Sequence, residues 1–158
     1  MRLLVVLGSG GHTKEMVRLV ELLGSTFEYC YLVASDDDLS PRKIRFAGPV
    51  YAVIRPRWKD TALPMVVLRT VLCTIQSLAA LIRARPHAII STGPGPAVPA
   101  SMLAKLLGIK VIYIETGSRV FALSSSGRIL YRFADLFFVQ WPELLAHCPR
   151  GTYAGRLF

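Results

Sequence analysis

A glycine-rich segment near the start of the chain, Gly8-Ser9-Gly10-Gly11-His12-Thr13, has the residue types of an anion-binding turn. Five apolar residues, Leu3 to Leu7, precede it and are typical of a strand buried on both faces. Thr13 has the side chain of a helix N-cap, and the residues after it follow a helical apolar spacing. Free backbone N–H groups and the positive end of a helix dipole favour a phosphate or diphosphate at such a turn. We therefore expect residues 8 to 13 to bind a diphosphate.

Two further segments carry residue types that suit a sugar or a second anion. Thr92, Gly93 and Gly95 follow a second apolar run, so they form another strand–glycine–helix junction. Glu115 ends a third run, and it has the chemistry to orient a sugar hydroxyl, serve as a base or pair with Arg119. His12 suits either a diphosphate, when protonated, or general-base catalysis on a hydroxyl.

The elements that must position these residues follow from the pattern of apolar runs. Helical spacing at residues 13–23, 61–85, 97–107 and 124–133 alternates with strand-like runs, which predicts βαβ units and a parallel sheet. The expected fold is α/β, a Rossmann-like doubly wound sheet in the order 3-2-1-4-5-6, formed by residues 1–158 as one domain. In that order the three polar segments converge at the carboxyl edge of the sheet. The six predicted strands are Leu3–Leu7, Phe27–Ala34, Val50–Ile54, His87–Ser91, Lys110–Glu115 and Leu136–Val139.

Composition restricts the partners of the chain. The 158 residues carry a formal net charge of +9 and are 53% hydrophobic, which excludes disorder and favours an acidic partner beside an apolar surface. Nucleic acid fits the charge alone and is not expected as a partner. Cys30, Cys73 and Cys148 lie far apart without metal-ligand spacing, so we expect no metal and no cofactor, and a reducing compartment.

A basic segment and a long apolar helix suggest contact with a membrane. Arg55, Arg57 and Lys59 surround Trp58, and residues 61–85 approach the ~20 residues that span a bilayer. Polar residues interrupt this helix, so we expect a crossover helix on the sheet whose first turns touch the lipid interface. A solvated basic loop is the alternative. The residues expected to pack on the sheet are Leu68, Val71, Leu72, Ile75, Leu78, Ala79 and Ile82.

The glycine segment also supports a different class of function. It is similar to the dinucleotide fingerprint G-x-G-x-x-G, although Thr13 replaces the third glycine. Asp36 follows the second predicted strand, where an acidic residue can hold a ribose. A nicotinamide-binding domain is therefore the rival interpretation, although 158 residues leave no second domain for a hydride acceptor.

Taken together, the motifs resemble one known family. The chain is similar, over almost its whole length, to the membrane-associated subunit of the bipartite UDP-N-acetylglucosamine transferase of asparagine-linked glycosylation, and to its bacterial counterparts in capsule and exopolysaccharide synthesis. The segments that carry the resemblance are the glycine segment, Ser91 to Gly95, Tyr113 to Glu115, Tyr131 to Pro142 and the end Gly155-Arg156-Leu157-Phe158.

This resemblance implies the acceptor-binding N-terminal half of a GT-B glycosyltransferase, which docks with a separate donor-binding subunit through Leu157 and Phe158. It implies a polyprenyl-diphosphate-linked sugar as acceptor, with His12 and Glu115 acting on its hydroxyl. The implied location is the cytoplasmic face of a membrane, the plasma membrane if the chain is prokaryotic. The N-terminal anchor of the eukaryotic subunit has no counterpart here, so the Arg55 to Ile75 region or the partner is expected to provide attachment. A non-catalytic anchor for the catalytic partner remains an alternative.

Overall fold

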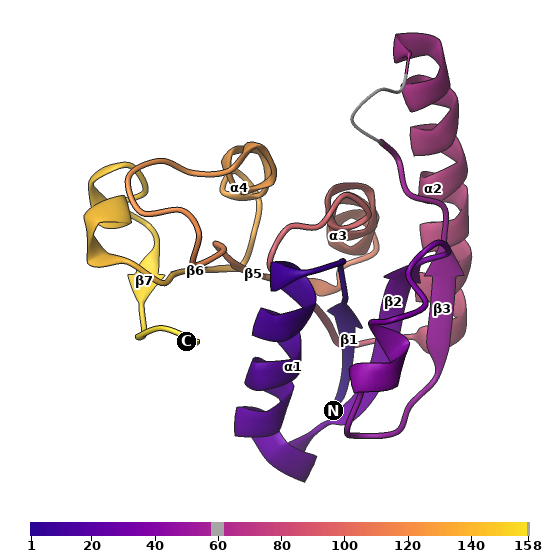
Figure 1. Cartoon of the computed structure of the whole chain (residues 1–158), viewed down its shortest axis with the longest axis horizontal. Coiled ribbons are helices and arrows are strands. Elements are labelled where there is room, and N and C mark those ends of the chain that lie inside the picture. Colours follow the sequence, from indigo (N-terminus) through magenta and orange to yellow (C-terminus); the bar gives the residue numbers. More distant parts are fainter. Residues whose placement is uncertain (58–61, 158) are drawn as a thin grey trace.

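A parallel sheet in the order β3-β2-β1-β4-β5-β6-β7 forms the centre of the protein (Figure 1). The computed structural model describes residues 1–57 and 62–157. The strands are β1 (Arg2–Val6), β2 (Glu28–Ala34), β3 (Val50–Val53), β4 (Ala88–Ser91), β5 (Lys110–Ile114), β6 (Leu136–Val139) and β7 (Thr152–Tyr153). The α-helices are α1 (Gly11–Leu23), α2 (Leu63–Ala84), α3 (Ala97–Leu106) and α4 (Ser125–Leu130), and short 3-10 turns lie at Gly24–Thr26, Pro41–Lys43 and Pro142–Ala146.

The predicted order of the first six strands is confirmed, and a seventh strand was missed. β7 pairs in parallel with β6, with Thr152 beside Phe138 and Tyr153 beside Val139. Two residues are too short a run to show a strand pattern, so the sequence predicts no strand in this segment.

The fourth helix is shorter than predicted and ends at Leu130 instead of near Phe133. The chain turns into β6 because Asp135 is tied to β5, where its N–H donates to the Val111 carbonyl and its carboxylate accepts from the Val111 N–H. Lys105 and Lys110 also donate to this carboxylate. Burial alone would raise the pKa of Asp135, but these hydrogen bonds and charges lower it to about 2.

The sheet has an apolar core on each face because its strands are buried on both sides. On β1, Leu3 and Val5 point toward α1, whereas Leu4 and Val6 point toward α2 and α3. Beyond α1, the residues of β4, β5 and β6 on the same face line an apolar groove of about 410 Å³ that also includes Leu157. The groove lies between α1 and the C-terminal segment.

The packing predicted for α2 is wrong. Its buried residues are mostly small, namely Cys73, Ser77, Ala80, Leu81 and Ala84, because small side chains let the helix lie close to the sheet and α3. Of the larger residues expected to face the sheet, Leu68, Val71, Leu72, Ile75 and Ile82 are exposed instead. An apolar stripe is present, as predicted, but it faces outward.

The N-terminal half of α2 projects past the carboxyl ends of the strands (Figure 1). All of its buried residues lie at Cys73 or beyond, and among the preceding turns the Arg69 guanidinium donates to the Arg55 carbonyl. By length and mean hydropathy (1.9 over its most apolar window), α2 could cross a membrane. Its C-terminal half is nevertheless part of the folded core.

Candidate functional site

The glycine segment forms a tight turn between β1 and α1. Gly10 has φ 73°, a conformation that glycine adopts without strain. α1 begins at Gly11 and has no side-chain cap, so the N–H groups of its first turn lack helical partners. A Cβ atom added to Gly10 or Gly11 would meet nothing within 4 Å. The turn thus offers backbone donors and the positive end of α1 to open space, as an anion site requires.

The expected cap role of Thr13 is wrong. Its side chain is fully buried inside α1, where the hydroxyl donates to the Gly8 carbonyl and lies 2.6 Å from Ser40 Oγ. This contact closes the turn from within. Thr13 therefore stabilises the glycine turn with its hydroxyl, which is buried and faces away from the open side.

The loop after β4 lies directly against the glycine turn, as predicted. A Cβ atom on Gly8 would lie 2.3 Å from Cβ of Pro94, so only glycine permits this close approach. Gly93 has φ 91° and its carbonyl accepts from Ser126 of α4. Gly95 is exposed and faces Pro56. The turn at residues 8–13 and the loop at residues 92–95 therefore lie side by side, and together they form one continuous rim at the carboxyl edge of the sheet.

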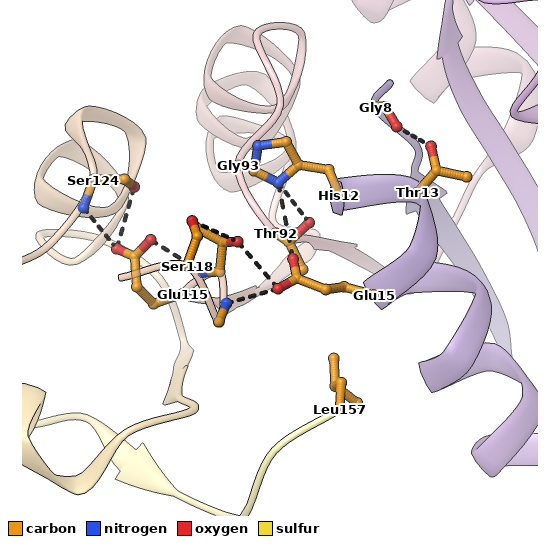
Figure 2. A network of polar contacts seen from close by, with 12 residues as sticks. Gly8, His12, Thr13, Glu15, Thr92, Gly93, Glu115, Ser118, Ser124 and Leu157 are labelled. Carbon is orange, nitrogen blue, oxygen red and sulfur yellow. Dashed lines mark hydrogen bonds and ion pairs between the residues drawn. The ribbon is translucent and has the colours of Figure 1, made fainter. Parts of the chain in front are cut away.

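His12 lies at the centre of this rim, between Thr92 and Glu15 (Figure 2). Its Nδ1 is 3.1 Å from Thr92 Oγ1 and 4.0 Å from Glu15 Oε2. Burial lowers the pKa of His12 below its ordinary value of 6.5, against smaller opposing effects of Glu15 and Thr92. The imidazole is therefore neutral at neutral pH, which is the form that a general base needs.

Glu15 and the residues around it were missed by the sequence analysis. This carboxylate is only 2% exposed, and its Oε1 accepts from the Thr116 hydroxyl, the Gly117 N–H and the Gln140 side-chain amide. It therefore joins α1 to the segments that follow β5 and β6. One signal was present: a charged residue on the apolar stripe of a helix, one turn after His12.

The structure places Glu115 under the start of α4 and apart from the open side of the site. One oxygen accepts from the N–H and hydroxyl of Ser124, and the other from the Thr116 N–H and the Tyr113 hydroxyl. Burial raises its pKa, and these hydrogen bonds oppose that shift. Because both oxygens are occupied, the geometry favours a structural role. The predicted action of Glu115 on an acceptor hydroxyl stays untested.

A pocket of about 630 Å³ opens beside His12 and Glu15. Its other wall is formed by Thr116 to Ser118, Gln140, Trp141 and Arg156. The Arg156 guanidinium lies 4.6 Å from the Trp141 ring centroid, which places a cation and an aromatic face beside the imidazole. The pocket is large enough for a sugar–diphosphate group.

The remaining predicted site residues lie at the margins. Arg119 is exposed, and no ion pair joins it to Glu115 within residues 1–57 and 62–157. Arg55 pairs with Asp36 at 3.0 Å and reaches Ser9 Oγ at 3.3 Å, so it borders the glycine turn. Arg57 is exposed. Leu157 is partly buried, and its N–H donates to Gln140. Trp58, Lys59 and Phe158 lie outside the described residues.

Comparison with known proteins places the chain among subunits of one enzyme. A family model described as "Oligosaccharide biosynthesis protein Alg14 like" matches residues 3–157. The human UDP-N-acetylglucosamine transferase subunit ALG14 is 34% identical over 99% of this chain and 83% of its own length. The subunit of the same name from Schizosaccharomyces pombe is also 34% identical, over 97% of this chain and 81% of its length.

Solved structures show the same fold in longer proteins. MurG from Acinetobacter baumannii superposes with a TM-score of 0.71 at 16% identity, over 98% of this chain and 43% of its own. A UDP-N-acetylglucosamine 2-epimerase superposes with a TM-score of 0.74 at 14% identity, over 94% of this chain and 44% of its own. The chain thus spans less than half of each, and it corresponds to the Rossmann-like N-terminal half of a GT-B fold.

Proposed function

The chain belongs to the Alg14 family of oligosaccharide biosynthesis proteins, and from this premise we propose that it is the acceptor-binding, membrane-associated subunit of a two-chain inverting glycosyltransferase. The coarser part, that it is a subunit of a glycosyltransferase, follows from the family and the GT-B-like fold. This favours a transferase over the nicotinamide-binding alternative. The names of its relatives suggest a UDP-sugar as donor.

The observation that carries the acceptor assignment is the position of His12 between an open helix N-terminus and a pocket. The free N–H groups of α1 suit the diphosphate of a polyprenyl-linked sugar, because they are donors at the positive end of a helix dipole. The pocket beside them then receives the sugar, within reach of the imidazole.

In the proposed reaction, His12 is the general base. Its neutral imidazole takes the proton from an acceptor hydroxyl as that oxygen forms a bond to C1 of the donor sugar. The bond between C1 and the UDP oxygen breaks at the same time, and UDP leaves with the bonding electrons. Attack opposite the leaving group inverts the configuration at C1. The donor sugar and UDP are held by the second subunit.

The partner subunit is proposed to supply the half of the fold that this chain does not contain. The C-terminal segment and the apolar groove beside it support this interface, because an apolar sheet face normally has a covering layer. Leu157 lies at this edge, where its N–H is fixed by Gln140.

The outward face of α2 is proposed to rest in the membrane interface. Leu63, Met65, Val67 and Leu68 are between 47% and 76% exposed on the projecting half of the helix. This half rises from the same edge of the sheet as the glycine turn (Figure 1). Insertion of these turns would place the pocket close to the headgroups, where the diphosphate of a lipid-linked sugar lies.

Acceptor binding tests the proposal directly. The probes are nanodiscs that contain either a polyprenyl-diphosphate-linked N-acetylglucosamine or the matching polyprenyl monophosphate. We expect the chain to bind the diphosphate discs more tightly. Gly11→Glu should weaken that binding by on the order of tenfold or more, because it places a negative charge beside the diphosphate.

Gly11→Gln is the matched variant, since it adds the same bulk without the charge. Neither side chain meets a neighbour at its Cβ, and glutamate and glutamine both have a higher helix propensity than glycine, so both variants should fold. Equal affinity for the two lipids, or equal binding by both variants, would contradict the proposed diphosphate site.

A further inference from the structure

The carboxylate of Glu15 is buried and has one oxygen without a hydrogen-bond partner. Within the described residues, Oε2 has no donor, although the side chain is almost fully buried. A buried carboxylate oxygen without a donor is costly and uncommon in folded proteins. Its presence one helical turn from His12 therefore calls for an explanation.

Hydrogen bonds to the other oxygen, Oε1, prevent the carboxylate of Glu15 from rotating to bring Oε2 to a donor. Oε1 accepts from Thr116 Oγ1 at 3.0 Å, from the Gly117 N–H at 2.6 Å and from Gln140 Nε2 at 3.1 Å. These donors come from the segments after β5 and β6, so they fix the carboxylate from the side opposite α1. Oε2 is left directed at His12, with Nδ1 at 4.0 Å (Figure 2).

Thr92 alone does not fix the protonation of the imidazole. Its Oγ1 is 3.1 Å from Nδ1, and a hydroxyl can either donate to a bare Nδ1 or accept from a protonated one. A carboxylate can only accept. Glu15 Oε2 faces Nδ1 and has no other donor in the part of the chain that the structure describes, so it favours a proton on Nδ1. The free lone pair of the neutral imidazole is then on Nε2.

We propose that Glu15 is the positioning residue of His12: it selects the tautomer protonated on Nδ1, keeps Nε2 free to take the acceptor proton, and stabilises the imidazolium that results. This inference rests on the proposed function of His12 as general base. The 4.0 Å separation shortens in the reacting complex, where such hydrogen bonds tighten. Glu15 acts on the acceptor proton only through His12.

Other charged groups near the imidazole are few. Arg156 lines the same pocket from the C-terminal segment, and Arg55 reaches Ser9 in the turn before α1. Both cations disfavour an imidazolium. Glu15 is the group with the opposite effect, and it raises the pKa of His12 against burial.

The tautomer of His12 tests the proposal in the unmodified chain. Long-range 1H–15N spectra of the 158-residue protein distinguish the ring nitrogens, and loss of one set of signals in His12→Ala assigns them among the three histidines. We expect neutral His12 to be protonated on Nδ1. Protonation on Nε2 would overturn the proposal without any further variant.

Glu15→Gln reverses the polarity that His12 meets while it conserves volume. The new amide oxygen can still accept from Thr116, Gly117 and Gln140, and the amide NH2 then faces Nδ1. We expect the Nε2–H tautomer, a lower pKa of His12 because the carboxylate charge is gone, and a fall in kcat of the assembled enzyme by on the order of 100-fold with little change in KM. An unchanged tautomer and kcat would overturn the proposal.

Glu21→Gln is the control, because it removes a carboxylate from the same helix. Glu21 pairs with Arg18 and Arg45 at the surface, so its variant should leave the tautomer of His12 and kcat as they are. His12→Ala distinguishes failure of the positioning role of Glu15 from failure of the general-base role of His12. If it abolishes turnover while Glu15→Gln does not, the positioning role fails alone; if it leaves turnover intact, the proposed role of His12 fails.

Discussion

The contribution of α2 to membrane binding can be calculated from the exposed fractions of its apolar side chains. Leu68, Val71 and Leu72 are 53%, 51% and 40% exposed. Full burial of such a side chain is worth about 2 kcal/mol, so the exposed part of each leaves about 1 kcal/mol for transfer into the lipid interface. Replacement of all three by glutamine should therefore cost about 3 kcal/mol, or roughly a hundredfold in the vesicle partition coefficient.

The assay is flotation or tryptophan-quenching titration with vesicles of anionic phospholipid. Glutamine is chosen because its helix propensity is close to that of leucine, so thermal stability should change little. Leu106→Gln with Leu107→Gln serves as control, since both residues are exposed at the C-terminal end of α3. That variant should bind vesicles like the parent chain.

Salt separates the apolar from the electrostatic part of the binding. The net charge of +9 attracts anionic lipid, and raised ionic strength screens this attraction. The contribution of α2 should persist at high salt. If the triple variant binds as tightly as the parent chain at high salt, α2 is not the membrane-facing element.

Three further predictions concern stability and assembly. Gly127→Ala should lower the free energy of unfolding by about 1–3 kcal/mol, because its Cβ would lie against Glu115 Oε2. Gly11→Ala is the control and should not lower it. Urea denaturation measures both variants. The pKa of Asp135 is lowered to about 2, so this carboxylate stabilises the fold above its unfolded pKa of about 4, and that stability is lost as pH falls from about 4 to about 2. Asp135→Asn should remove this part of the acid transition in unfolding followed by circular dichroism. Leu157→Asp should weaken binding of the partner subunit by roughly tenfold in a calorimetric titration, and unaltered binding would remove the C-terminal segment from the interface.

The sheet could be predicted because each strand is a short apolar run bounded by glycine or polar residues. The order followed from the alternation with helices and from right-handed crossovers. β7 escaped because it contains only Thr152 and Tyr153. The orientation of α2 escaped because the helix is apolar on both sides, and its small residues, not its large ones, lie against the sheet.

The site was partly predictable for a similar reason. The convergence of the loops after β1, β4 and β5 follows from the strand order, and the contact of His12 with Thr92 agrees with it. The network around Glu15 joins residues more than 100 positions apart, and no local sequence pattern predicts such contacts. Glu115 was singled out because it ends a strand, but its local hydrogen bonds to Ser124 and Thr116 were not readable from spacing.

Turnover with and without the second subunit tests the central claim most directly. The chain purified alone and the complex purified from native membranes through a tag on this chain are each given radiolabelled UDP-N-acetylglucosamine and a polyprenyl-diphosphate-linked sugar. We expect lipid-linked product from the complex only, and its loss when the chain carries His12→Ala. Robust turnover by the isolated chain, or an active complex with His12→Ala, would contradict the account.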